Sequence, residues 1–415
     1  MGLAIRGPIR NLATLAFGNA MMPALALLVA PLLARELGPD GRGLYAAYTS
    51  VLLLMGVVGT FGAQDGLTHF VAHRGWTTRN AARASLLFLL PASFASVLIV
   101  ILASTFLFGS IDERIVFFAL SLTLPVQILF NMAIGIATGS RDYRAVNLLK
   151  VIPAVARTIV IVGLCVFTTV NAAIAAAVLL LSPAVGLAWY FIHISRSLAS
   201  DSSPAVSPSL LRRTNELKPL IRFSLGVFPG VLASMAATRL DQVIGLPLIG
   251  ADQLGLYAAA VSIAEIPLIV GTAGRSFVIA IETDGLHDRS VSRAIALVLA
   301  GTVAASGGLA LVSPWFIPWF FGSDFAGAVI PTIILLVGTV IYTALSLASA
   351  RLIATKRTRS HSLSLTVGAV AGLVALVVLS RFGAIGAAMA SVIGYIVGLA
   401  VALIATKVRD PGAER

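Results

Sequence analysis

The sequence predicts an all-α integral membrane protein with twelve transmembrane helices in two six-helix bundles. Of its 415 residues, 58% are hydrophobic and 11% are charged, whereas a soluble domain carries about 25% charged residues. No water-soluble fold buries this much apolar surface, so the surrounding medium must be lipid. A repeat near the midpoint of the chain predicts two similar halves.

Twelve apolar runs are each long enough to cross a hydrocarbon layer of about 30 Å, which needs some ~20 residues of helix. Helices are expected because every backbone polar group in lipid must be satisfied within its own segment. The predicted spans are 12–34, 44–63, 82–108, 115–138, 146–168, 172–194, 219–248, 256–281, 293–321, 326–350, 361–380 and 383–405. They give an N-terminal bundle over residues 1–195 and a C-terminal bundle over 218–415. Residues 196–217, rich in serine and proline, are expected to form a flexible cytoplasmic linker.

The repeat relates residues that lie 212 positions apart. Residues 38–47 (GPDGRGLYAA) match residues 250–259 (GADQLGLYAA) at seven of ten positions. Six spans per half is an even number, so both halves enter the membrane from the same side. The repeat is therefore parallel, and its pseudo-twofold axis is expected to run along the membrane normal.

Basic residues predict the orientation of the chain. With the N-terminus inside, 23 of the 29 Lys and Arg residues fall in inner loops and tails, and five fall on the outer side. Cytoplasmic loops carry such an excess, so we expect a cytoplasmic (inner) membrane protein with both termini in the cytoplasm. A nucleic-acid partner is not expected, because its site would gather basic residues on one face.

Four ionisable residues lie inside apolar spans: Arg157, Arg239, Asp241 and Glu265. Each costs about 2.5–3.5 kcal/mol near the bilayer centre, so such a side chain usually faces a cavity or a partner. We expect a water-accessible cavity in which Arg239 and Arg157 attract an anionic group. Asp241 and Glu265 would respond there to H+ or Na+. The alternative is a closed ion pair between Arg239 and either acid, which would lock the bundle.

Two further pairs of polar residues share a spacing of four. Gln127 and Asn131 lie on one helical face, where they either line the substrate cavity or bond neighbouring helices. His69 and His73 have no third ligand nearby in the sequence, so neither a metal site nor another cofactor is predicted.

Tyrosines and absent motifs complete the sequence-based expectations. Tyr45, Tyr48 and Tyr257 are expected in an aromatic belt at the outer surface. The sequence contains neither the P-loop pattern GxxxxGK[ST] nor the zinc pattern HExxH. Because the outer loops are also too short for a catalytic domain, we expect that the chain is not an enzyme.

Three stretches form longer motifs. Residues 32–45 (LLARELGPDGRGLY) match the pattern LAR-x-LGP-x-x-x-G-x-Y, and Arg239-Leu240-Asp241 with the turn at 250–257 matches R-x-D…G…LG-x-Y. Residues 382–388 (FGAIGAA) match G-x-x-G-A-A. In this order and spacing the motifs resemble polysaccharide flippases, the oligosaccharide exporters of the multidrug/oligosaccharidyl-lipid/polysaccharide (MOP) superfamily.

The resemblance implies a V-shaped pair of bundles with a central cavity, formed by the first, second, seventh and eighth spans. It also implies a lipid-diphosphate-linked oligosaccharide as substrate, moved between leaflets by alternating access. Membrane lipids and the glycosyltransferases and polymerase of the same pathway would be its partners. One alternative is a cation-coupled antiporter of the multidrug type, although the acid that such exporters often carry on the first helix is missing from residues 12–33. The other is a non-transporting scaffold for glycan assembly.

Overall fold

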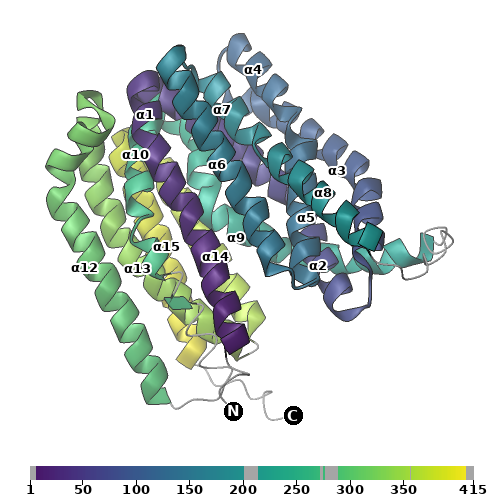
Figure 1. The fold of residues 1–415 in the computed structure, drawn as a ribbon. Helices are drawn as coiled ribbons and strands as arrows, with labels where there is room; N and C mark the ends of the chain where they lie inside the picture. Colours follow the sequence, from purple (N-terminus) through teal and green to yellow (C-terminus); the bar gives the residue numbers. More distant parts are fainter. Residues whose placement is uncertain (1–5, 201–213, 272–273, 276–287, 356, 408–415) are drawn as a thin grey trace. The chain divides into compact units, whose positions relative to one another are not determined.

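The computed structural model describes residues 6–200, 214–271, 274–275, 288–355 and 357–407. Every regular element in these ranges is a helix (Figure 1). The described residues of the twelve predicted spans fall on helical segments and the turns between them, so the predicted all-α fold class is confirmed. Residues 201–213 of the predicted linker lie outside the described residues.

Eight segments of the described chain are long and apolar enough to cross a membrane. Two of them, Ala24–His73 and Arg359–Thr406, have 50 and 48 residues, against about 20 needed for one crossing. The first is broken at Gly38, where φ is 63°, and the second at Gly383, where φ is 58°. Each of these segments is therefore long enough for two crossings, and the chain is a multi-pass membrane protein.

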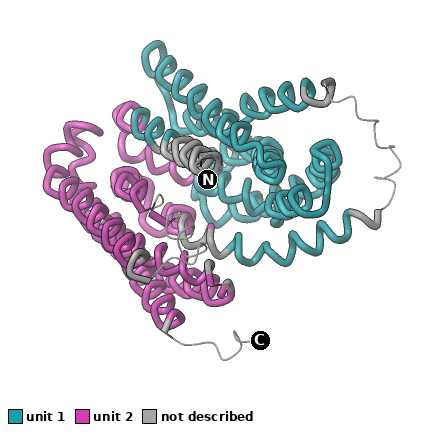
Figure 2. The backbone as a smooth tube through the Cα atoms, turned by 60° about the horizontal axis from the view of Figure 1, so that its bottom comes forward, with its two compact units in different colours: residues 1–29, 48–232 teal, residues 30–47, 233–415 magenta. Residues whose placement is uncertain are grey.

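The chain divides into two compact units, coloured separately in Figure 2. Unit 1 comprises residues 1–29 and 48–232, and unit 2 comprises residues 30–47 and 233–415. Two long helices, α1 (Arg6–Val58) and α9 (Thr214–Ile249), each contribute to both units. The units thus differ from the predicted bundles at 1–195 and 218–415, because each unit takes in a stretch of helix from the other half. The bundle boundaries stay a prediction.

Unit 1 is built around an apolar core that includes Leu67, Phe70, Ile128, Met132 and Leu220. Leu220 comes from α9, which is why the first part of that helix belongs to this unit. The remaining helices of unit 1 are α2 (Ala63–His73), α3 (Thr78–Leu107), α4 (Ile111–Ser121), α5 (Leu124–Gly139), α6 (Tyr143–Phe167), α7 (Ala172–Leu181) and α8 (Pro183–Ser200).

Prolines divide two of the predicted spans in unit 1 into two helices each. Pro125 cannot donate a backbone hydrogen bond, and α4 ends at Ser121, four residues before it. Pro183 likewise begins α8 directly after α7 ends. Proline at position 183 has no amide proton to donate to the carbonyl of Leu179. The Ser182 hydroxyl donates to that carbonyl instead, at 2.8 Å.

The outer surface of unit 1 is apolar, as contact with lipid requires. Helix α3 exposes Leu90, Phe94 and Phe106, and 83% of the Phe106 side chain is accessible. Its buried positions are small residues such as Ala84, Ser96 and Ser104. This inversion of a soluble helix, with large apolar groups outside and small residues inside, is typical of packing between membrane helices.

Unit 2 packs its last two long helices closely through glycines. Gly368 and Gly372 on α14 face Gly394 and Gly398 on α15, and a Cβ atom on Gly368 would lie 2.8 Å from the Gly394 carbonyl oxygen. Such small-xxx-small spacing lets two membrane helices approach closely. The helices of unit 2 outside α1 and α9 are α10 (Ala251–Ala264), α12 (Asp288–Phe321), η2 (Ser323–Ala328), α13 (Val329–Ala354), α14 (Thr358–Leu379), η3 (Ser380–Phe382) and α15 (Gly383–Lys407).

The sequence repeat is visible as a reciprocal contact inside unit 2. Pro39 and Ala251 are 212 residues apart, as are Gly43 and Gly255. A Cβ atom on Gly43 would overlap the carbonyl oxygen of Ala251, and a Cβ atom on Gly255 would overlap that of Pro39. Each contact repeats the other with the two halves interchanged. A twofold axis between the two segments produces this relation. This local symmetry supports the parallel repeat.

The helix that follows the second repeat motif is interrupted. Helix α10 ends at Ala264, and a turn over Glu265–Pro267 precedes a further helical stretch from Leu268. Pro267 lacks an amide proton, and the amide of Leu268 bonds the carbonyl of Glu265 instead of that of Ala264. The Ala264 carbonyl accepts a hydrogen bond from the Thr339 hydroxyl of α13 at 3.0 Å. A side chain of the neighbouring helix therefore satisfies the backbone group at the break.

Candidate functional site

A buried hydrogen-bond cluster in unit 2 centres on Asp241 of α9. One carboxylate oxygen accepts from the Tyr257 hydroxyl of α10 and, at 3.4 Å, from the Ser391 hydroxyl of α15. The other oxygen accepts from the Gln242 amide at 2.8 Å. The Tyr257 and Ser391 hydroxyls also lie 2.9 Å apart. One carboxylate thus ties together the consecutive helices α9 and α10 and the distant helix α15.

A cavity of about 50 Å³ adjoins this cluster within unit 2. A water molecule needs about 10–15 Å³ measured in this way, so the cavity has room for a few. Asp241, Ser391, Tyr342 and Tyr395 supply polar lining groups, and the closely packed glycines Gly368, Gly372 and Gly394 also line it. Asp241 is accordingly only half-buried, and the cavity is suited to water or a small cation at the carboxylate.

Arg239 and Glu265 belong to the electrostatic surroundings of this cluster. Arg239 interacts electrostatically with Asp241, and both Arg239 and Glu265 interact with Tyr395. Arg239 is half-buried and Glu265, at the end of α10, is exposed. Within the described residues, the closed ion pair weighed as an alternative is absent: the one Lys, Arg or His nitrogen within 4 Å of a carboxylate oxygen there belongs to His193, beside Asp142.

The other three candidate residues lie in unit 1. Arg157 is half-buried on α6. Gln127 is 3% exposed, and its Nε2 donates to the Leu180 carbonyl at 2.5 Å. The Asn131 Nδ2 donates to the Gly56 carbonyl at 3.1 Å. Both amides thus bond the backbone of neighbouring helices, which supports their alternative role of joining helices. A role in substrate contact stays a prediction.

The expected aromatic belt is wrong for all three tyrosines. Tyr257 is 1% exposed, and Tyr45 and Tyr48 are also buried. Tyr48 packs its ring 5.1 Å from that of Phe108. The Tyr257 hydroxyl bonds Asp241 and Ser391 instead of facing the interface. The close packing at Gly43 and Gly255 draws the segments that carry Tyr45 and Tyr257 together, which favours burial of these two rings.

Sequence reasoning identified Asp241 but missed Tyr257, Ser391 and Tyr395 as its surroundings. Ser391 and Tyr395 lie four residues apart on α15, hence on one helical face. Their position beside the glycine pairs of α14 and α15 was the available signal. For metal binding, the described residues contain no group of three or more His, Cys, Asp or Glu side chains placed to hold an ion.

The fold and this site define a class: a multi-pass helical membrane protein whose second unit holds a carboxylate beside a small internal cavity. Three solved structures share the fold. A lipid II flippase, MurJ, in an inward closed conformation aligns with TM-score 0.73 and 16% identity, covering 96% of this chain and 88% of that one. An inward-facing multidrug resistance MATE family transporter of the MOP superfamily aligns with TM-score 0.71 and 16% identity, covering 95% and 97%.

A MOP superfamily transporter from Pyrococcus furiosus Vc1 (DSM3638) aligns with TM-score 0.64 and 16% identity, covering 98% of this chain and 97% of that one. Residues 9–278 match the family described as polysaccharide biosynthesis protein. This chain belongs to that family, which confirms the predicted family resemblance, and its likeness to transporters of the MOP superfamily is one of fold. None of the curated proteins matches it.

Proposed function

We propose that this chain is a flippase that moves a lipid-diphosphate-linked oligosaccharide from the cytoplasmic to the outer leaflet of the cytoplasmic membrane. Its membership of the polysaccharide biosynthesis family carries the proposal. The likeness to a lipid II flippase supports it, because a lipid-linked glycan is then handled by the same fold. In this proposal the chain is a transporter and not an enzyme, and both of its termini are cytoplasmic. Glycosyltransferases supply its substrate, and a polymerase consumes it after transport.

Transport proceeds by alternating access of the substrate path to the two sides of the membrane. Arg239 and Arg157 contact the diphosphate or acidic sugars, and Gln127 and Asn131 hold the helices that line the path. The half-buried positions of both arginines support this role, because each guanidinium keeps some access to solvent or ligand.

Asp241 couples this movement to H+ or Na+. Binding of either cation neutralises the carboxylate and weakens its hold on the hydroxyls of Tyr257 and Ser391. Those hydroxyls belong to α10 and α15, so a change in charge at one atom alters the packing of three helices. Glu265 acts at the break after α10, where an interrupted helix is easier to bend than a continuous one.

The proposal is tested by deleting the gene in its host and measuring surface glycan. We expect loss of surface glycan and accumulation of the lipid-linked precursor in the inner leaflet, both restored by the intact gene. Arg239→Ala at normal protein levels should restore export only in part, because it removes a charge that contacts the substrate. Normal surface glycan in the deletion strain would refute the transport role.

The likeness to MATE transporters favours a second candidate, a cation-coupled antiporter for small amphiphiles. It predicts that the deletion strain becomes sensitive to amphiphilic drugs while its surface glycan is unchanged. The two phenotypes are opposite, so one strain decides between the candidates.

A further inference from the structure

A second group of titratable side chains lies in unit 1, away from Asp241. Asp65, His69 and His73 are spaced four residues apart and share one face of α2. The opposite face of this helix carries Leu67 and Phe70, which are buried in the core of unit 1. Asp65 and His73 are exposed and His69 is half-buried. The helix therefore presents a polar stripe, Asp65–His69–His73, whose two ends are exposed and whose middle residue packs against α9.

Ring stacking holds the two imidazoles in place. The His69 ring lies 4.4 Å from the Phe223 ring of α9, with 11° between the planes, and 5.0 Å from the His73 ring, with 25° between them. Stacking involves the faces of the rings. The nitrogen atoms lie at the ring edges, where they can still form hydrogen bonds in the ring plane. Within the part of the chain that the structure describes, no hydrogen bond or ion pair engages the side chains of His69, His73 or Asp65.

The charged residues near the stripe are mostly basic. Helix α5 packs against α2 and carries no charged residue. Asp65 is the one acid on α2 itself. The basic residues of the surrounding segments are Arg74 after α2, Arg79 and Arg83 on α3, and Lys218 and Arg222 on α9. The same part of α9 also contains Glu216, so the sequence of these segments holds five cations and two carboxylates, an excess that favours anions.

We propose that His69 and His73 bind a phosphate-type anion, namely the diphosphate of the lipid-linked substrate as it enters from the cytoplasmic leaflet. This inference rests on the proposed flippase function and orientation, which place the end of α2 at the inner membrane surface. A neutral imidazole offers one N–H donor and a protonated imidazole offers two. The pair can therefore supply up to four donors to diphosphate oxygens.

Asp65 distinguishes an anion site from a cation or proton site. Its carboxylate lies one helical turn beyond His69 and repels an anion held there. Asp65→Asn should therefore strengthen diphosphate binding. If the stripe were a cation site, the same change would remove a ligand and weaken binding.

The test measures binding of farnesyl diphosphate to the full chain in detergent by calorimetry between pH 6 and 8. Inorganic diphosphate and phosphatidylglycerol vesicles serve as comparison probes. His69→Phe keeps the stack on Phe223 but removes both nitrogens, and His73→Gln changes an exposed position, so neither is expected to unfold the helix. Each should weaken farnesyl diphosphate binding by about tenfold, the loss typical of a charge-assisted hydrogen bond. The double variant should bind more weakly than either single variant, and His193→Gln serves as a matched control that leaves binding unchanged.

Unchanged binding in both histidine variants would overturn the inference, and so would weaker binding in Asp65→Asn. An affinity for inorganic diphosphate equal to that for farnesyl diphosphate would also overturn it, because the site would then bind a soluble anion. Binding to the vesicles that does not depend on the histidines would also count against it. A parallel assay of lipid-linked glycan movement in vesicles separates this failure from that of the proposed function. Absence of movement with histidine-dependent binding intact would reject the flippase, whereas movement with histidine-independent binding would reject only this site.

Discussion

Asp241 shows at the level of one residue how a membrane protein keeps a charge inside an apolar segment. Its carboxylate has hydrogen bonds from Tyr257, Ser391 and the Gln242 amide, and it reaches a small cavity. A buried carboxylate with several donors is far less costly than an isolated one. The same accessibility makes it suited to exchange a cation, since its charge is not cancelled by a permanent partner.

Asp241→Asn is predicted to abolish the response of transport to an imposed H+ or Na+ gradient. Asparagine keeps the shape and an acceptor oxygen for Tyr257 but places an NH2 group opposite the Gln242 backbone amide, so thermal stability should fall by about 1–3 kcal/mol. The measurement is movement of lipid-linked substrate in vesicles with and without each gradient. Asp252→Asn, at an exposed acid in the first turn of α10, is the control and should respond as the unaltered protein does.

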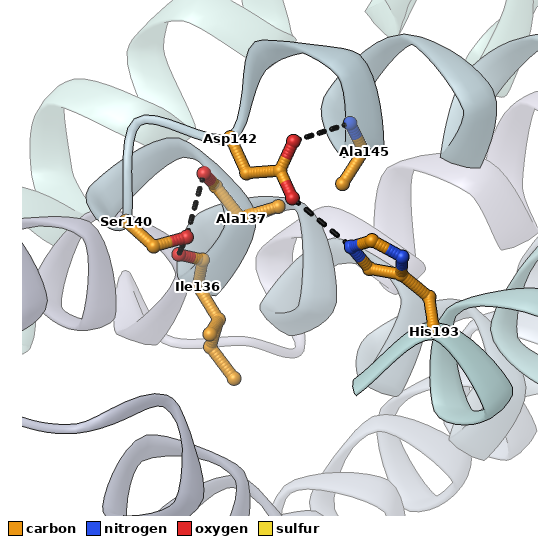
Figure 3. Close-up of polar contacts among 6 residues, drawn as sticks. All are labelled: Ile136, Ala137, Ser140, Asp142, Ala145 and His193. Atoms are coloured by element: carbon orange, nitrogen blue, oxygen red, sulfur yellow. Dashed lines mark hydrogen bonds and ion pairs between the residues drawn. The ribbon is translucent and has the colours of Figure 1, made fainter. Parts of the chain in front are cut away.

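The pair of Asp142 and His193 illustrates a different use of a carboxylate (Figure 3). One Asp142 oxygen caps α6 by accepting from the Ala145 amide at 2.9 Å, and the other lies 3.1 Å from Nε2 of His193 on α8. The side chains are 39% and 40% exposed. An exposed ion pair contributes about 0–1 kcal/mol, whereas a helix cap contributes about 0.5–2 kcal/mol.

We therefore predict that Asp142→Ala destabilises unit 1 more than His193→Gln does. Asp142→Asn should behave like His193→Gln, because asparagine caps a helix as well as aspartate does. Thermal unfolding of the purified protein in detergent provides the comparison. Equal losses in Asp142→Ala and Asp142→Asn would mean that the contact with His193, and not the cap, is the stabilising interaction.

At the scale of elements, the interruption at Glu265–Pro267 depends on a neighbouring helix. The Thr339 hydroxyl bonds the Ala264 carbonyl, and without it that carbonyl has no donor in an apolar environment. Thr339→Val should cost about 1–3 kcal/mol, the penalty for a buried unsatisfied acceptor. The Thr339 hydroxyl also lies 2.9 Å from the Leu335 carbonyl of its own helix. Thr332 is likewise buried, but the one acceptor of its hydroxyl among the described residues is the nearby Ala328 carbonyl.

Thr332→Val is therefore the matched control and should cost less than Thr339→Val in the same thermal unfolding measurement. The change at Thr339 should also impair transport, because it alters the break that positions Glu265. Equal stability of the two variants would contradict this account of the break.

At the scale of the whole molecule, the repeat acts through the reciprocal contact of Gly43 and Gly255. Each glycine packs on a backbone carbonyl of the other half, so neither position has space for a side chain. Gly43→Val and Gly255→Val should each cost about 3 kcal/mol or more, because overpacking against backbone cannot be relieved by a rotamer change. Gly307→Val and Gly308→Val are matched controls on α12, where a Cβ atom meets open space.

The loss should appear as lower protein level in the membrane and a lower unfolding temperature. Because the two glycines share one interface, the effects of Gly43→Ala and Gly255→Ala should not add. Additive losses would show that the two positions act independently and that the symmetric contact is not a single interface.

The sequence alone determined the helical class, the places of the spans and the repeat. These properties follow from composition and local order, because lipid demands long apolar helices whatever their neighbours are. Asp241 was also identifiable, since a charge within an apolar run stands out without any structure.

Only the tertiary structure decided what surrounds those residues. Tyr257 and Ser391 lie 16 and 150 positions from Asp241, and the exchange of residues 30–47 into unit 2 crosses the boundary that the repeat suggested. Gln127 and Asn131 proved to bond backbone carbonyls of other helices. The physical reason is that hydropathy is a local property, whereas the partners of a polar side chain depend on how packed helices are rotated and how closely glycines let them approach.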